Sequence, residues 1–216
     1  SVVCRLEDGG ELEAECLLVS VGRRPNVEGL GLDGAGVKHG KGGIEVNERM
    51  ETSASGVYAA GDAVGGLMLA HVATREGVAA AENAMGRRVE VRYEAMPNTI
   101  YTLPEVSSVG LTEEEAKERG IEIVTGRSPF AANGKAKGLG EEEGFVKWVA
   151  SKEEGALLGL HVVGPHATEL VASGVIAVER GMTSREYGRA VLPHPTLSEA
   201  LADAVEAIHG TSINQQ

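Results

Sequence analysis

Cysteine, aromatic residues and long apolar runs are all scarce in this sequence of 216 residues. Its two cysteines, Cys4 and Cys16, are too few for a secreted disulfide framework and do not have CxxC spacing, so we expect both to be reduced in a cytoplasmic protein. No apolar run approaches the ~20 residues that cross a bilayer. The first residues have neither the basic start nor the apolar run of a signal peptide.

Positive charge is in deficit as well, with 20 Lys and Arg against 32 Asp and Glu. The resulting net charge of −12 repels phosphate backbones and anionic lipid, so we expect neither nucleic acid nor a membrane surface as a partner. Glycine, by contrast, is abundant at 30 residues, whereas the aromatics are one Trp, four Tyr and two Phe. We therefore expect a core of closely packed aliphatic side chains.

The first part of the chain combines short strand patterns with glycine-rich loops. The predicted elements are a hairpin over 2–7 and 11–16, strands over 16–21, 43–46 and 56–62, and a helix over 67–85. The apolar strand over 16–21 ends at Gly22, and Gly86 ends the helix. The apolar face of this helix is predicted to consist of Leu69, Val72, Ala73, Val78 and Ala81.

The pattern changes after Pro97. Strands are predicted over 99–110, 121–129, 144–150 and 156–163, with helices between and after them. Three capping boxes mark helix starts, namely Thr112 with Glu115, Thr183 with Glu186, and Thr196 with Glu199. The helix ends are assigned to Gly120, Gly181 and Gly210. Strands in series rather than strict alternation predict an α+β domain with an antiparallel sheet, beginning near Met96.

Common nucleotide and metal motifs are absent from the sequence. Residues 29–34 fit GxGxxG by letter, but they follow a loop containing proline and no helix opens after them. There is no Walker motif, no HExxH and no His or Cys spacing suited to a metal. We expect no metal site, and we interpret four histidines as surface or packing residues: His39, His161, His166 and His209.

The segment from Thr52 to His71 is the most specific ligand-binding pattern in the first part of the chain. Small residues at 59–61 let a planar ligand approach the backbone where a strand ends, and Asp62 offers carboxylate oxygens to hydroxyl donors. A helix starting near Met68 would direct its N–H groups toward the same place. The alternative is that Asp62 is only a turn residue.

Residues 52–62, followed by Met68-Leu69-Ala70-His71, resemble the second FAD-binding segment of the pyridine nucleotide–disulfide oxidoreductases. Residues 19–26 resemble the exit from that family's NAD domain, and residues 101–105 and 129–133 resemble its interface domain. The resemblance covers essentially the whole chain and is closest to the dihydrolipoamide dehydrogenases. It implies that Asp62 bonds the flavin's ribityl chain and that the backbone of 68–71 contacts the isoalloxazine edge. The cofactor-binding residues expected for FAD and NAD are Gly22, Gly61, Asp62, Met68, Leu69, Ala70 and His71.

The run His194-Pro195-Thr196-Leu197-Ser198-Glu199 supplies the predicted catalytic pair. Imidazole can give or take a proton near neutral pH, as thiol–disulfide chemistry requires, and a carboxylate on its other nitrogen would fix its tautomer. Taken locally, the favoured interpretation is a plain capping box, with His194 in a loop rigidified by Pro195. The resemblance reverses this preference: it implies that His194 is the acid–base contributed across a dimer interface and that Glu199 orients it.

Three family elements are missing: the GxGxxG loop for FAD, the redox Cys-x4-Cys pair and the GxGxxG loop for NAD. Cys4 and Cys16 are separated by eleven residues in a hairpin, so neither is assigned to the redox pair. We therefore expect a C-terminal portion, inactive alone, of an enzyme that oxidises a dithiol with NAD through FAD. Its predicted organisation is an NAD-domain tail over 1–26, a second FAD segment over 27–96 and an interface domain over 97–216. The expected fold is thus an α+β dimerisation domain preceded by an incomplete α/β FAD/NAD-binding portion.

Two alternatives remain open: a dimerisation module without redox activity, and part of another disulfide reductase such as glutathione reductase.

A homodimer is expected through residues 97–216, because four strands are too few to cover the apolar helix faces there. Those faces consist of Leu170, Val171, Val175, Ile176, Val178, Leu197, Leu201, Val205 and Ile208. The parent enzyme is expected to associate with a 2-oxo acid dehydrogenase or glycine cleavage complex.

Overall fold

The computed structural model describes residues 1–214, and the chain divides into two compact units. The first unit spans Ser1–Val91 and the second begins at Arg92. Within the described residues, every helix is too short or too polar to cross a membrane. The finer boundary predicted after residue 26 stays a prediction.

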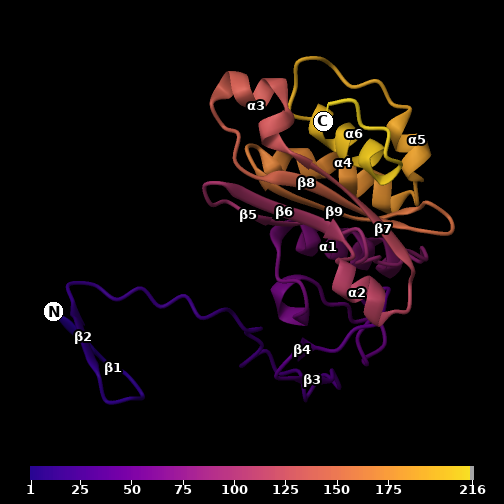
Figure 1. Cartoon of the computed structure of the whole chain (residues 1–216). Helices are drawn as coiled ribbons and strands as arrows, with labels where there is room; N and C mark the ends of the chain where they lie inside the picture. The colour runs from indigo at the N-terminus through magenta and orange to yellow at the C-terminus, as the bar shows by residue number, and fades with distance from the viewer. Residues whose placement is uncertain (215–216) are drawn as a thin grey trace. The chain divides into compact units, whose positions relative to one another are not determined.

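The first unit contains two small antiparallel ladders and one long helix (Figure 1). Its elements are β1 (Val2–Arg5), β2 (Glu11–Ala14), β3 (His39–Gly40), β4 (Gly43–Ile44), the 3-10 helix η1 (Gly61–Val64) and α1 (Ala70–Ala84). The pairing of β1 with β2 confirms the hairpin predicted over 2–7 and 11–16. Gly86, with a φ of 85°, follows the end of α1 as predicted.

Two predicted strands of the first unit are wrong. Residues 16–21 form no strand, and their apolar side chains are exposed, with Leu18 at 88% and Val21 at 91%. An apolar run becomes a strand only when a neighbouring strand pairs its N–H and C=O groups, and no described residue does so here. Residues 56–62 likewise give only an isolated bridge from Tyr58 to Glu51 before η1 begins at Gly61.

The predicted apolar face of α1 is also partly wrong. Val78 and Ala81 are exposed, whereas Glu76 and Asn83 are buried. The polar atoms of both buried residues bond to backbone: Glu76 accepts from the Gly61 N–H at 2.7 Å, and Asn83 bonds to Arg49 and Val89. A buried polar group stabilises a fold only when it is paired in this way, and periodicity of apolar residues does not reveal such pairing.

The second unit is a five-stranded antiparallel sheet with its two longest helices packed along one face (Figure 1). Its strands are β5 (Asn98–Ile100), β6 (Glu105–Gly110), β7 (Ile123–Pro129), β8 (Phe145–Ser151) and β9 (Leu157–Gly164), in the order β5-β6-β9-β8-β7. Its helices are α2 (Glu113–Glu118), η2 (Phe130–Ala132), α3 (Gly134–Leu139), α4 (Ala167–Glu179), α5 (Ser184–Gly188) and α6 (Glu199–Ile208). This architecture confirms the predicted α+β domain.

The single strand predicted over 99–110 is two strands. β5 ends at Ile100 and β6 begins at Glu105, with a turn over 101–104 between them. Pro104 cannot donate a hydrogen bond to a sheet, so the ladder is interrupted before it. The two strands then pair with each other as an antiparallel hairpin, which makes five strands instead of four.

Helix starts and ends follow the predicted chemistry in most cases. The capping boxes of Thr112 with Glu115 and Thr183 with Glu186 are both formed. Positive φ angles place the glycines after three helices as expected: Gly120, Gly181 and Gly210. The third predicted box, at Thr196, is only half formed, as described below.

The core of the second unit surrounds the buried side chain of Trp148 on β8. Its indole N–H donates to the Leu201 carbonyl at 3.0 Å and ties the sheet to α6, and its ring packs edge-on against Tyr187. The helix faces offered as a dimer surface lie mostly in this core, since Leu170, Val171, Leu197, Leu201 and Val205 are buried. The prediction of uncovered helix faces is therefore wrong except at Ile176, because α4 packs on β6 and β9 and α6 packs on β7 and β8.

Candidate functional site

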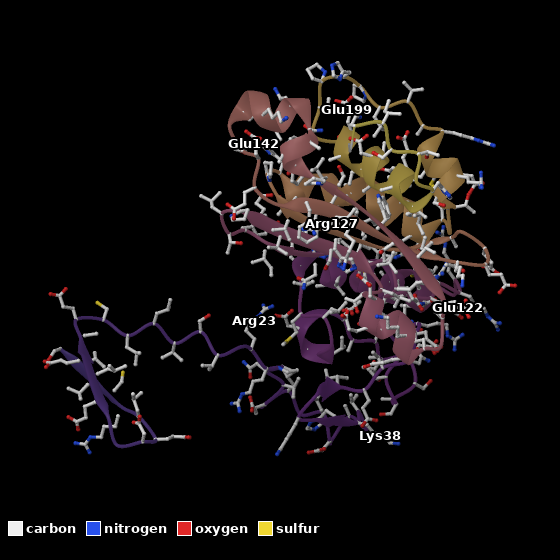
Figure 2. All side chains as sticks on the ribbon, viewed as in Figure 1. Arg23, Lys38, Glu122, Arg127, Glu142 and Glu199 are labelled. Carbon is white, nitrogen blue, oxygen red and sulfur yellow. The ribbon has the colours of Figure 1, made fainter. Side chains whose placement is uncertain are left out.

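His194 and Glu199 meet at the start of α6, as their spacing predicts. The His194 Nδ1 atom lies 2.9 Å from the Glu199 Oε1 atom, with 78% of the histidine side chain exposed and 27% of the glutamate. Figure 2 shows Glu199 at the beginning of α6. A partly buried carboxylate therefore holds an accessible imidazole by one ring nitrogen.

Glu199 uses its second oxygen to hold the backbone of the same loop. Its Oε2 atom accepts the Thr196 N–H at 2.8 Å. The predicted capping box is wrong in its other half, because the Thr196 hydroxyl donates to the Pro193 carbonyl and Glu199 is the first residue of α6. The carboxylate thus binds the imidazole and the loop at once. The capping interpretation and the catalytic interpretation of Glu199 are therefore partly compatible.

Asn133 fixes the loop that carries His194. Its amide nitrogen donates to the Thr196 carbonyl at 3.0 Å, across 63 positions of sequence. Its amide oxygen accepts the Ala136 N–H in the first turn of α3 and so caps that helix. The side chain is buried. Asn133 was part of the motif over 129–133, but only the structure shows which residue of that motif contacts the loop.

The contacts of Glu199 favour its ionised form. Partial burial acts against ionisation, but hydrogen bonds from the Thr196 N–H and the His194 ring outweigh it and lower the pKa of Glu199 below its usual value. One turn further along α6, burial raises the pKa of Asp203, opposed by a hydrogen bond from Asn214 and assisted by the charge of Glu199. The carboxylate beside His194 is therefore held in its ionised form.

This arrangement leaves the Nε2 atom of His194 for proton exchange. Among residues 1–214 no hydrogen bond to Nε2 is formed. A carboxylate at Nδ1 favours the tautomer that carries the proton there, and it stabilises the imidazolium formed when Nε2 takes a second proton. The pair can therefore act as a general base and, in the reverse direction, as a general acid.

The second predicted site lies entirely in the first unit. Asp62 is in η1, Met68 and Leu69 precede α1, and Ala70 and His71 form its first turn. The residue before α1, Leu69, makes no side-chain cap hydrogen bond to the start of the helix. A Cβ on Gly61 would lie 3.3 Å from the Ala73 side chain, which explains why a residue without a side chain stands before Asp62.

Arg23 joins the two parts of this segment and was not among the predicted site residues. Its Nη1 atom donates to Asp62 Oδ2 at 3.0 Å, and its Nη2 atom donates to the Met68 carbonyl. Figure 2 labels Arg23 in the segment before β3. The sequence presents Arg23 and Arg24 as equivalent neighbours, so it offered no signal for choosing between them.

The segment fits a flavin in its donor and acceptor chemistry. Within the described residues, the hydrogen bonds of the Asp62 carboxylate use Oδ2 only, which leaves Oδ1 to accept a hydroxyl. Backbone N–H groups at the start of α1 suit the polar edge of an isoalloxazine ring. Gly22, another of the residues expected to bind a cofactor, has a φ of 107° and open space where a Cβ would stand.

The cysteines and histidines form no further site in the part of the chain that the structure describes. Cys4 and Cys16 are free thiols, and no group of three His, Cys, Asp or Glu side chains suited to a metal is present among residues 1–214. His161 contacts the Leu111 carbonyl and His209 contacts Ser184. The chemistry of the chain is therefore concentrated at His194 with Glu199 and around Asp62.

Two protein-family models match this chain. Residues 96–205 match the pyridine nucleotide-disulphide oxidoreductase dimerisation domain, and residues 1–77 match the pyridine nucleotide-disulphide oxidoreductase domain. The chain therefore belongs to the pyridine nucleotide-disulphide oxidoreductase family.

Within that family, the chain is similar to dihydrolipoyl dehydrogenases. The chain is 49% identical over 205 residues to dihydrolipoyl dehydrogenase of Thermus scotoductus, covering 94% of the chain and 44% of the relative. It is 44% identical over 202 residues to dihydrolipoyl dehydrogenase of Bacillus subtilis, covering 93% and 43%. The crystal structure of LpdA from Mycobacterium tuberculosis matches with a TM-score of 0.90 and 32% identity, covering 94% of the chain and 45% of LpdA. The resemblance found in the sequence is thus confirmed, and the chain spans less than half the length of these relatives.

Proposed function

We propose that the chain forms the C-terminal part of a flavin-dependent dihydrolipoamide dehydrogenase. The observation that carries this proposal is the contact between His194 and Glu199, which holds an exposed imidazole ready for proton transfer. Its setting in a chain related to dihydrolipoyl dehydrogenases indicates the substrate, a dithiol oxidised to a disulfide.

His194 acts as the base toward the dithiol. Its Nε2 atom takes the proton of a substrate thiol, and the resulting thiolate is the nucleophile that attacks a redox disulfide. Glu199 keeps the other ring nitrogen protonated and stabilises the imidazolium. In the reverse direction the imidazolium returns the proton to a departing thiolate. The redox disulfide itself is outside this chain, whose two cysteines are both free thiols.

Asp62 and the backbone of 68–71 are the proposed FAD contacts, with Gly61 giving access to the backbone. Gly22 is the proposed contact toward NAD. Bound FAD and NAD would supply the acceptors for the electrons that leave the dithiol. The chain's own contribution is to position these cofactors and to move the proton at Nε2.

The test uses the chain alone and a reconstituted flavoprotein, made by joining it to the N-terminal portion of the Thermus scotoductus relative. We expect the 216-residue chain, supplied with FAD, not to reduce lipoamide with NADH, whereas the reconstituted flavoprotein does. NADH oxidation at 340 nm and flavin absorbance near 450 nm are the measurements. Activity in the purified chain alone, or a flavin-free and inactive reconstituted protein, would contradict the proposal.

We also propose that the second unit forms a homodimer. The match of residues 96–205 to a dimerisation domain supports it. So do exposed apolar side chains in the second unit, above all Leu103 and Val191, each 97% exposed. Val191 lies three residues before His194, so an interface covering it would bring the imidazole close to the partner.

Sedimentation velocity at micromolar concentration tests the dimer. We expect the chain to sediment as a dimer and Val191→Asp to shift it toward monomer, because a buried unpaired carboxylate opposes association. Leu18→Asp is the matched control, since Leu18 is 88% exposed and lies in the first unit. A monomeric wild-type chain, or equal dimer content in both variants, would be incompatible with this interface.

The larger assembly is part of the same proposal. We propose that the intact enzyme associates with a 2-oxo acid dehydrogenase or glycine cleavage complex, and size-exclusion chromatography of the mixed components tests it. A cytoplasmic location is supported by the two free cysteines, and fractionation of cells that express the protein tests it.

A further inference from the structure

We propose that Arg23 is a positioning residue for the flavin, setting the Asp62 carboxylate and the Met68 carbonyl in the arrangement that receives it. This inference rests on the proposed function, because it assumes that the segment around Asp62 binds FAD. It assigns a role to a residue that contacts both parts of that segment. It also gives Arg23 a role that its neighbour Arg24 does not share.

The contacts of Arg23 span two distant points of the chain. One guanidinium nitrogen bonds the Asp62 carboxylate, 39 positions away, and the other bonds the Met68 carbonyl, 45 positions away. A guanidinium is planar and presents its donors at fixed angles, so both acceptors are held in one relative orientation. A lysine could satisfy only one of them with comparable geometry.

The backbone beside Arg23 is also held against this segment. A Cβ on Gly65, the residue after η1, would lie 3.5 Å from Pro25 Cγ and 2.1 Å from the Gly42 carbonyl oxygen. Pro25 therefore lies next to the end of η1, two residues after Arg23. The arginine thus reaches Asp62 from a chain segment that is itself anchored.

The contact is suited to orientation rather than to stability. The side chains of Arg23 and Asp62 are 62% and 50% exposed, and exposed ion pairs contribute little to folding. The ion pair orients one carboxylate oxygen and leaves the other available to a hydroxyl donor. A carboxylate that is already oriented loses less conformational entropy when a ligand binds. Arg23 also brings positive charge to a chain with a net charge of −12, which favours an anionic dinucleotide.

Arg24 provides the matched control. It has the same charge and the neighbouring position, but its partner is Glu28, at 3.8 Å, in an exposed ion pair. Neither Asp62 nor Met68 is among its contacts within the described residues. Arg24→Gln therefore removes one positive charge without removing the bridge.

The experiment measures FAD affinity in the reconstituted flavoprotein, by titrating the apoprotein with FAD and following flavin fluorescence. We expect Arg23→Gln to weaken FAD binding about tenfold, which is the range of one charge-assisted hydrogen bond. Arg23→Lys should fall in between and Arg24→Gln should stay within about twofold of wild type. Melting temperatures of the apoproteins should agree among all three variants, because the ion pair is exposed.

A double-mutant cycle separates positioning from a direct charge effect. If Arg23 acts through Asp62, the loss from Arg23→Gln shrinks in an Asp62→Asn background. Equal FAD affinity in wild type and Arg23→Gln, or an equal loss in Arg24→Gln, would overturn the role of Arg23 and leave the proposed function standing. A wild-type protein that binds no FAD would overturn both.

Discussion

His194→Gln is expected to lower the turnover of dihydrolipoamide in the reconstituted flavoprotein by about 10²–10⁴-fold, the usual cost of removing a general base. Glutamine can keep a hydrogen bond to Glu199 but has no nitrogen that takes up a proton near neutral pH. Flavin content should be unchanged, because the proposed FAD contacts lie in the first unit. Steady-state kinetics with NAD, normalised to flavin absorbance, are the measurement.

Two further variants test whether the loss of turnover is specific to the base at His194. Glu199→Gln should cost less than His194→Gln, because a neutral amide can still accept the Thr196 N–H and orient the ring, although it stabilises the imidazolium less. His39→Gln is the matched control, since His39 pairs with Asp33 in the first unit and has no place in the proposed chemistry. Undiminished turnover in His194→Gln would return His194 to the role of a loop residue.

The sequence predicts the contact between His194 and Glu199 because both residues lie within one short run at a helix start. Local spacing of this kind constrains geometry strongly. The same holds for the capping boxes at Thr112 and Thr183 and for Gly181 after α4. These features depend on a few neighbouring backbone groups, so local sequence is sufficient to predict them.

Features that depend on distant partners could not be predicted in the same way. The apolar run over 16–21 has strand composition, but a strand requires a neighbouring strand that local sequence does not specify. Arg23 and Asn133 act across 39 and 63 positions, so their partners become visible only in the fold. Glu76 was missed for a related reason: burial of a carboxylate is tolerated because the Gly61 N–H bonds it.

Gly126→Ala is expected to destabilise the chain strongly. A Cβ at this buried position of β7 would lie 2.0 Å from the Ala204 carbonyl oxygen and 2.8 Å from the Ile208 nitrogen, both on α6. Backbone atoms cannot rotate away as a side chain can, so α6 must shift from the sheet. We expect a loss of about 3 kcal/mol, at the upper end of ordinary overpacking. The melting temperature should fall on the order of 6–12 °C.

The same shift should reach the catalytic pair. Glu199 is the first residue of α6, whereas the loop of His194 is bound through Thr196 to Asn133 at the start of α3. A displaced α6 therefore moves the carboxylate relative to the imidazole, and we expect Gly126→Ala to lower turnover as well as stability. Gly138→Ala is the matched control, because a Cβ there meets nothing within 4 Å and alanine favours the helical conformation of α3 by up to ~1 kcal/mol. Calorimetry and kinetics on both variants test this coupling, and equal melting temperatures would show that α6 accommodates the methyl group without moving from the sheet.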